Sequence, residues 1–233
     1  MKLHADLTVR ASVHAAGLAW LPSPAGGVDR RMLHRVGDEV AQATSIVRYA
    51  PGSRFAPHTH GGGEEFLVLE GVFQGESGDY PAGTYVRNPP GSRHAPGSQA
   101  GTTIFVKLWQ FDPGDSAQVR IPAHAAARVT ETGRHSVQVA PLHRTAHEDV
   151  RIEHWAPRQT IALDLPLGGE FLVLEGSFTE GGETFAPQSW LRVPSRARLR
   201  AQTGDAGARV WVKLGHLQHL AYLATLVPDQ QAQ

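Results

Sequence analysis

The sequence predicts an all-β protein built from two similar units in tandem, followed by a short C-terminal helix. Its 233 residues include 25 Gly and 16 Pro, and these turn formers divide the chain into short apolar runs such as 45–49 and 103–109. Short runs between turn residues are typical of strands in a β-sandwich or β-barrel. The other two observations are an internal repeat and a single stretch of helical spacing near the C-terminus.

The internal repeat is clearest at 65–73 and 170–178, which read EFLVLEGVF and EFLVLEGSF and lie 105 positions apart. Shorter matches accompany it: YAP and WAP at 49–51 and 155–157, LHR at 33–35 and 142–144, and VKL at 106–108 and 212–214. The displacement varies slightly among these matches, as loop insertions would produce. We therefore predict two β units, at 1–112 and 127–233, joined by a linker at 113–126.

The repeated runs 66–69 and 171–174 are apolar at every position, whereas a strand with one face in water alternates polar and apolar residues. Phe66 and Val68 are expected to face the interior of their own unit, so Leu67 and Leu69 need a second covering layer. We expect the matching run of the other repeat to supply it across a pseudo-twofold axis, as two subunits meet in a dimer. A terminal segment, or a second chain in a homodimer, is the alternative.

The C-terminal stretch 214–226 has leucines at intervals of three, which predicts a short amphipathic helix. His216 and His219 lie three apart on this stretch. We interpret them as the polar edge of the helix, because such an edge is ordinary in an amphipathic segment.

Composition excludes several classes of function. The formal net charge is zero and no basic run is long enough to follow a phosphate backbone, which argues against nucleic-acid binding. No stretch of about 18 apolar residues predicts a membrane span, and the N-terminus lacks the apolar core of a signal peptide, so a cytoplasmic protein is expected. The absence of Cys excludes disulfides, thiolate metal sites and cysteine nucleophiles.

Two segments have the spacing of a metal site. The first, 52–71, reads GSRFAPHTHGGGEEFLVLEG, and the second, 83–94, reads GTYVRNPPGSRH. Residues two apart on a strand project to the same face, so His58 and His60 present their imidazoles side by side. The three glycines at 61–63 then allow a sharp reversal into the next strand.

Glu64 opens that next strand, and His94 arrives after a Pro-Pro-Gly turn. Three neutral imidazole nitrogens and one carboxylate suit a borderline divalent metal, and an octahedral ion would keep two open positions for water or substrate. Zinc, iron, manganese and nickel all fit this description. Glu65 is the alternative carboxylate, although the six residues between Glu64 and Gly71 favour Glu64.

These segments resemble the paired motifs of the cupin superfamily, G-x5-H-x-H-x3,4-E-x6-G and G-x5-P-x-G-x2-H-x3-N, with Ser98 in place of the final Asn. More narrowly, HTHGGGEEFLVLEGVF and GDYPAGTYVRNPPGSRHAP are similar to the cupin domain of ChrR-type anti-sigma factors and their stand-alone relatives. The resemblance is strong over 44–112 and weaker over the second half. It implies two cupin barrels in tandem, that is, double-stranded β-helix or jelly-roll barrels forming a bicupin. It also implies four metal ligands in the first barrel: His58, His60, Glu64 and His94.

In ChrR proteins the cupin domain follows an N-terminal zinc-binding anti-sigma domain that uses His and Cys. This chain has no Cys and few residues before the predicted barrel, so we expect that domain to be missing. A sigma factor is accordingly a doubtful partner, and a small molecule is the expected one.

The second repeat has lost the predicted site. At the displacement of 105, His94 corresponds to Leu199, and the His-x-His segment falls on 161–165, which contains no histidine. Glu64 corresponds to Gly169, or to Glu170 if the gap is placed differently. We therefore expect the second barrel to bind no metal. Asn88 is lost together with the ligands, which makes it a candidate pocket residue.

Two classes of function compete for such a protein. As a sensor or regulatory module, a metal-binding ChrR-like bicupin would respond to a metabolite or an oxidant. As an enzyme, it would be a non-haem metal-dependent dioxygenase, or a related oxidoreductase, acting on a small oxygenated substrate such as a diketone or a phenolic ketone. The fold alone does not decide between them, because cupins host many chemistries.

Overall fold

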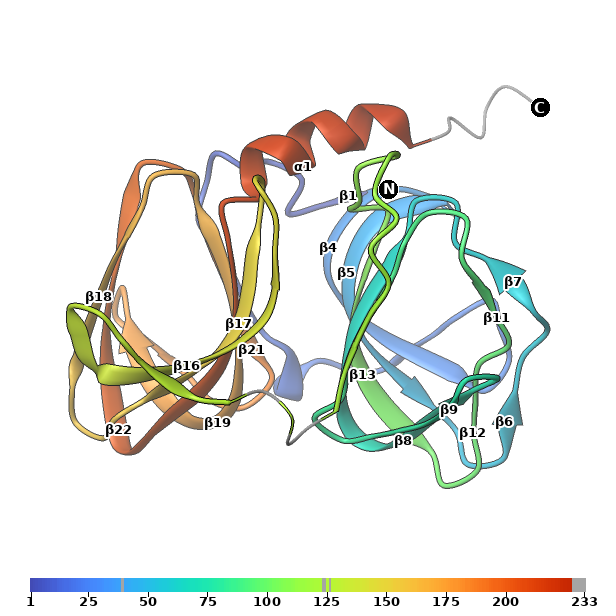
Figure 1. The fold of residues 1–233 in the computed structure, drawn as a ribbon, viewed down its shortest axis with the longest axis horizontal. Helices are drawn as coiled ribbons and strands as arrows, with labels where there is room; N and C mark the ends of the chain where they lie inside the picture. Colours follow the sequence, from blue (N-terminus) through green and yellow to red (C-terminus); the bar gives the residue numbers. More distant parts are fainter. Residues whose placement is uncertain (39, 123–124, 126, 228–233) are drawn as a thin grey trace. The chain divides into compact units, whose positions relative to one another are not determined.

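The computed structural model describes residues 1–38, 40–122, 125 and 127–227, and its regular structure is almost entirely β (Figure 1). The predicted all-β class is confirmed. So is the short C-terminal helix, α1, which spans Leu217–Leu223 and continues as the 3-10 turn Ala224–Leu226. No described helix is long and apolar enough to cross a membrane.

The chain divides into two compact units. The first consists mainly of Met1–Ala5 and Ala19–Ala125, and the second of Asp6–Leu18 and Ala126–Ala221. Each unit is a barrel of antiparallel strands, which Figure 1 shows in blue to green for the first and in yellow to red for the second. The predicted pair of β units is thus present.

The first barrel contains an eleven-stranded sheet with the main order β1-β4-β5-β13-β8-β10-β14, together with the separate pair β7 and β11. Its described strands are β1 (Lys2–Leu3), β3 (Leu21–Pro22), β4 (Val28–Gly37), β5 (Ala41–Tyr49), β6 (Ser53–Arg54), β7 (His58–Thr59), β8 (Glu64–Gly75), β9 (Gly78–Pro81), β10 (Tyr85–Asn88), β11 (Arg93–His94), β12 (Gly97–Ser98), β13 (Thr102–Leu108) and β14 (Val119–Ile121).

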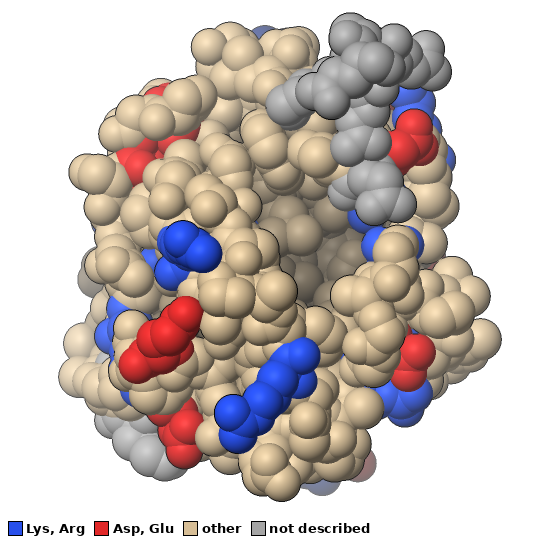
Figure 2. Space-filling view, turned by 90° about the vertical axis from the view of Figure 1, so that its right-hand side faces the viewer, with Lys and Arg blue, Asp and Glu red and all other residues tan. Residues whose placement is uncertain are grey.

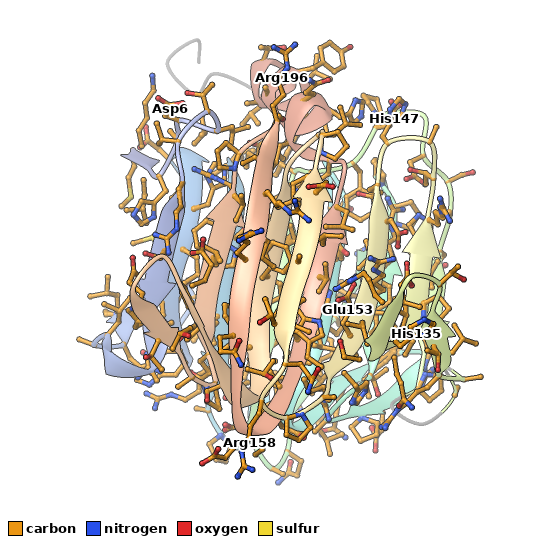
Figure 3. All side chains as sticks on the ribbon, turned by 90° about the vertical axis from the view of Figure 1, so that its left-hand side faces the viewer. Asp6, His135, His147, Glu153, Arg158 and Arg196 are labelled. Carbon is orange, nitrogen blue, oxygen red and sulfur yellow. The ribbon has the colours of Figure 1, made fainter. Side chains whose placement is uncertain are left out.

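The second barrel is one nine-stranded sheet with the main order β15-β16-β17-β22-β19-β21-β2. Its described strands are β2 (Ala11–His14), β15 (Val129–Glu131), β16 (Arg134–Arg144), β17 (Asp149–Trp155), β18 (Thr160–Leu165), β19 (Gly169–Glu180), β20 (Glu183–Phe185), β21 (Ser189–Val193) and β22 (Ala197–Leu214). Loops lie at both of its ends: Figure 3 shows His147 and Arg196 at one end and Arg158 at the other.

Two strands lie outside the predicted boundaries of their units. β2, from the start of the chain, pairs with β21 of the second barrel, with Ala11 opposite Arg192. β14, inside the segment predicted as linker, pairs with β10 of the first barrel. Both strands satisfy the backbone donors and acceptors of a sheet edge, which would otherwise stay open. Such short edge strands leave almost no pattern in the sequence.

The repeated apolar strands are buried on both faces over most of their length, although burial is incomplete at Leu69, which was expected to be covered. In β8, Phe66 and Val68 belong to the core cluster inside the first barrel. Leu67 points to the opposite face of the sheet, yet only 1% of its surface is exposed, and its counterpart Leu172 in β19 is fully buried. Leu69, at the end of the run, is half-buried.

Candidate metal centre

Three imidazoles converge at one end of the first barrel. β7 and β11 form a short antiparallel pair in which His58 lies directly opposite His94, so both rings project to the same side. His60 follows β7, and its backbone is tied to the opposite turn by hydrogen bonds with Gly91 and Ser92. One ring nitrogen from each histidine lies within 4.8 Å of the other two. Of the residues that the structure describes, only these three histidines form such a group.

The spacing of these nitrogens fits a shared ion. His60 Nε2 and His94 Nε2 are 2.9 Å apart. Two imidazole nitrogens bound at about 2.1 Å and at a right angle on one metal ion would lie about 3 Å apart. His58 Nδ1 donates to Ala56 O at 3.2 Å, which leaves its Nε2 without a proton and available as a ligand.

Glu64 completes the candidate site. Its Oε2 lies 3.5 Å from His60 Nε2 and 3.7 Å from His94 Nε2. Asn88, its direct cross-strand neighbour on β10, donates to the same oxygen at 3.0 Å and orients the carboxylate. Glu65 projects to the other face of β8, where the Tyr85 hydroxyl donates to it at 2.8 Å. The alternation of the strand therefore places Glu64, and not Glu65, beside the imidazoles.

The three glycines between His60 and Glu64 are required for different reasons. Gly63 has a φ of +75°, a left-handed conformation that glycine adopts at little cost. Gly61 and Gly62 lie under the ring of Trp109, and a Cβ on Gly62 would come within 2.2 Å of it. The sharp reversal was predicted from the sequence, whereas the packing of Trp109 was not.

Burial sets the protonation of the site. Burial lowers the pKa of His60 to about 4, with a smaller contribution from His58, and burial also lowers the pKa of His94. The imidazoles of His60 and His94 are therefore neutral near pH 7, as metal ligands must be. Burial raises the pKa of Glu64, although His94, Asn88 and His58 oppose this rise. No described Lys or Arg pairs with Glu64, so a bound cation would supply the missing positive charge.

The lowered pKa of His60 predicts a pH dependence of stability. In the unfolded chain His60 takes up a proton near its ordinary pKa of 6.5, and in the folded protein only near 4. The unfolded state therefore binds more protons between these values, and metal-free protein is expected to lose stability as the pH falls from about 6.5 to about 4. Urea unfolding in chelator across this range measures the effect. The variant His60→Asn should flatten this part of the curve, and an unchanged slope in that variant would contradict the assignment.

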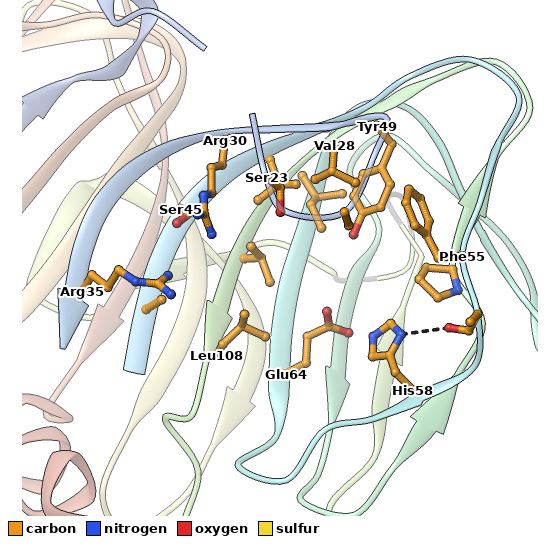
Figure 4. Close-up of a pocket in the computed structure, with 17 residues that line it drawn as sticks. Ser23, Val28, Arg30, Arg35, Ser45, Tyr49, Phe55, His58, Glu64 and Leu108 are labelled. Carbon is orange, nitrogen blue, oxygen red and sulfur yellow. Dashed lines mark hydrogen bonds between the residues drawn. The ribbon is translucent and has the colours of Figure 1, made fainter. Parts of the chain in front are cut away.

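A cavity of about 400 Å³ adjoins the site. His58 and Glu64 line one side of it, and the inward faces of β4, β5 and β13 supply mostly apolar walls (Figure 4). The surface on the side of β7 and β11 is hollowed near its centre, and the hollow shows mainly uncharged residues (Figure 2). A cavity with mostly apolar walls thus lies next to the candidate ligands.

Comparison with known proteins finds one matching family model. Residues 8–112 match the family model of the ChrR Cupin-like domain. The match spans 105 of the 233 residues, so this part of the chain is similar to that family. No curated protein sequence matches the chain.

Solved structures share its fold over most of its length. A Nostoc punctiforme protein described provisionally as a dioxygenase superposes with a TM-score of 0.71 at 14% identity, covering 89% of this chain and 82% of that protein. The bacterial pirin YhhW of Escherichia coli, in complex with nickel(II), superposes with a TM-score of 0.64 at 14% identity, covering 88% of this chain and 98% of that protein. Oxalate decarboxylase of Lactobacillus farciminis, as a formate complex, superposes with a TM-score of 0.63 at 10% identity, covering 88% of this chain and 86% of that protein. At these identities the likeness establishes the fold, a pair of cupin barrels.

The second cupin barrel has apolar residues at the equivalent positions. Leu163 lies opposite Leu199 in β18 and β22, the same register in which His58 lies opposite His94. Gly169 lies opposite Val193, as Glu64 lies opposite Asn88, so Glu64 corresponds to Gly169 and not to Glu170. Listed by barrel position, the replacements are Leu163, Leu165, Gly169 and Leu199 for His58, His60, Glu64 and His94.

The strand geometry changed together with these residues. β7 and β11 are two residues long, whereas β18 pairs with β22 over six consecutive residues. Leu165 and Leu199 belong to the core of the second barrel and are almost fully buried. Apolar packing and a continuous ladder therefore occupy the place that the candidate metal centre has in the first barrel.

A buried ion-pair network also lies in the second barrel. Glu153 on β17 (Figure 3) is fully buried and accepts from Arg134 at 2.8 Å, from Arg151 at 2.8 Å and from the Trp155 indole at 2.6 Å. Burial alone would raise the pKa of Glu153, but Arg134 and Arg151 outweigh burial and lower it. The residue of the first barrel that corresponds to Glu153 is Val47, because Val47 precedes Tyr49 by two residues as Glu153 precedes Trp155. Val47 lines the cavity.

Two remaining features of the motifs have structural roles. Ser98, which replaces the final Asn of the cupin motif, is buried and donates to Val72 O at 2.6 Å. His216, which directly precedes the C-terminal helix, lies 3.3 Å from Glu170, and His219 on the helix stacks on His147 with the ring centroids 4.6 Å apart.

Proposed function

We propose that the first barrel binds one divalent metal ion through His58, His60, His94 and Glu64 and exposes it to the adjoining cavity. The observation that carries this proposal is the convergence of three imidazole nitrogens within 4.8 Å beside a buried carboxylate that pairs with no described Lys or Arg. Zinc, iron, manganese and nickel remain the candidate ions. The nickel(II) complex of the structurally similar YhhW supports a metal of this kind.

The cavity supports a small oxygenated molecule as the ligand of this centre. A bound divalent ion would act as a Lewis acid toward a carbonyl or enol oxygen of that molecule. Tyr49 lines the same cavity, and its hydroxyl points into it (Figure 4). Burial raises the pKa of Tyr49, and the nearby Glu64 raises it further, so the phenol stays protonated and can donate a hydrogen bond to the ligand. The apolar walls would exclude water around the remainder of the molecule.

Purified protein is expected to contain one tightly bound metal ion per chain. The reason is that the four candidate ligands are present in the first barrel, whereas the second has leucines and a glycine in their place. Elemental analysis of the parent protein and of the double variant His58→Ala, His94→Ala, at equal protein concentrations, measures the metal content. The variant should be metal-free. Two ions per chain, or full occupancy of the double variant, would contradict the proposal.

A second candidate function is oxygenation of the bound molecule by the same centre. It is favoured by the similarity to the Nostoc punctiforme protein described provisionally as a dioxygenase, and by the cavity that adjoins the ligands. Oxygen consumption by iron-loaded protein in the presence of acetylacetone or a phenolic ketone tests it. The double variant His58→Ala, His94→Ala serves as the control.

A regulatory role is supported by the match to the ChrR Cupin-like domain. In that role a small molecule bound at the centre would be the signal. The two functions differ in one measurable property, because a sensor returns its ligand unchanged whereas an enzyme releases a product. Analysis of the bound compound by mass spectrometry after incubation in air separates them.

A further inference from the structure

Two arginines line the cavity that adjoins the candidate metal centre. Arg30 and Arg35 both come from β4, and Figure 4 shows Arg35 across the cavity from His58 and Glu64. Residues five apart on a regular strand would project to opposite faces. A β-bulge between Met32 and His34 inserts one residue, so the two guanidinium groups share the inward face.

Arg30 has no partner of its own in the described part of the chain. It forms no hydrogen bond or ion pair with any described residue, and its Nε is buried without an acceptor. Arg35 donates to the carbonyl of Asp38 and is buried. Ser45 also lines the cavity (Figure 4). Arg30 is partly buried, and a buried guanidinium nitrogen without an acceptor is costly, so an anion in the cavity would relieve that cost.

The outward-facing arginines of this wall are satisfied in a different way. Arg31 and Arg48 stack on Trp20, with guanidinium carbons 4.1 and 4.5 Å from the ring centroid, and Arg48 also pairs with Asp29 at 2.7 Å. Arg30 is therefore distinct among its neighbours, because it faces the cavity and no described group compensates its charge.

The second barrel has no counterpart of Arg30. Arg30 lies opposite Val47, and the equivalent position opposite Glu153 is Val139, a core residue. An apolar core residue therefore takes the place of this guanidinium in the second barrel.

We propose that the cavity binds an organic anion whose carboxylate is held by Arg30, with Arg35 nearby, and whose other end carries oxygen atoms directed at the metal centre. Apolar side chains such as Val47, Val106 and Leu108 would contact the body of the molecule. The ligand class is therefore an acid with a metal-binding carbonyl or enol group, separated from its carboxylate by a short apolar segment. The metal-directed half of this inference rests on the proposed function, whereas the carboxylate half does not.

Succinylacetone, a β-diketone with a carboxylate at its far end, and its neutral methyl ester are suitable probes. Calorimetric titration of metal-loaded protein is expected to show the acid binding about tenfold more tightly than the ester, or better, because a carboxylate gains charge-assisted hydrogen bonds from Arg30. Equal affinity of acid and ester in the unaltered protein would overturn the proposal without any variant.

The variant Arg30→Gln should abolish the preference for the acid, and Arg30→Lys should retain part of it. Arg48→Gln is the matched control, because it removes an arginine from the neighbouring strand that faces outward. A preference that survives Arg30→Gln, or one that is lost equally in Arg48→Gln, would overturn the role of Arg30. Thermal melts of each variant verify that the fold is intact.

A third probe separates failure of this inference from failure of the proposed function. Hexanoate has a carboxylate but no chelating oxygens, so its binding should depend on Arg30 and not on His58. If the chain binds no metal, the diketone of succinylacetone should add nothing to its affinity. Hexanoate should still bind more tightly than hexanol. If hexanoate shows no dependence on Arg30, the carboxylate site is wrong whatever the metal result.

Discussion

Replacing Leu172 or Leu67 by Asp is expected to lower the free energy of unfolding by about 3 kcal/mol or more, because each places an unpaired charge in a buried position. Leu172 is fully buried, and its direct neighbours on the adjacent strands are Trp190 and Trp211. Leu67 is 1% exposed and lies between Tyr85 and Phe105 in the same way. Neither substitution touches a candidate metal ligand, so any folded variant should keep its metal. Urea unfolding followed by circular dichroism measures the loss.

Two control substitutions isolate the charge effect. Leu167 is 41% exposed, so Leu167→Asp should change the stability by about 0.5 kcal/mol or less. Leu172→Met keeps the volume and the apolar character and should cost less than about 1.5 kcal/mol. If Leu67→Asp and Leu172→Asp unfold like the parent protein, the outward faces of β8 and β19 are open to water, and the expectation that they are covered is wrong.

Removal of the metal is expected to destabilise the first barrel by about 3 to 4 kcal/mol at a few hundred times the dissociation constant, because the ion binds the folded state only. The loss should concentrate where the candidate ligands lie. Hydrogen exchange measured by mass spectrometry should show faster exchange after chelation in β7, β11 and the start of β8. Peptides from β18 and β22 should be unaffected, since that barrel has leucines at the equivalent positions.

The double variant His58→Ala, His94→Ala supplies the control for this experiment. Its exchange pattern should already resemble that of the chelated parent and should not respond to further chelator. Unchanged melting and exchange of the parent, with metal loss verified by elemental analysis, would show that no stabilising ion is held there.

The sequence was sufficient for the parts of the site that depend on local spacing. The His-x-His pair, the glycine reversal and the turn before His94 each specify their own geometry within a few residues. The structure brings His58, His60 and His94 together, and their role as ligands stays a prediction. Strand alternation also distinguishes Glu64 from Glu65 once the starting residue of β8 is known.

The rest could not be predicted, because it depends on long-range pairing. Period-two alternation would place Arg30 and Arg35 on opposite faces of β4, and the bulge that brings them together follows from the register against β5. Likewise, β2 joins β21 far along the chain, and β14 lies in a stretch whose composition suggests only a linker. The network around Glu153 was missed because its arginines come from two different strands.

The packing of Trp109 on the glycine loop gives the candidate centre an intrinsic optical label. The indole of Trp109 lies against Gly61 and Gly62, and the backbone N–H of Trp109 donates to Gly63 O at 3.3 Å. Trp109 is therefore fixed to the loop between His60 and Glu64. An open-shell ion bound beside that loop would quench the emission of this fluorophore by electron or energy transfer, whereas closed-shell zinc would not. Of the five tryptophans in the chain, Trp109 is the one packed on this loop, so the quenched part of the total tryptophan emission would report in solution which kind of ion is bound, without any attached dye.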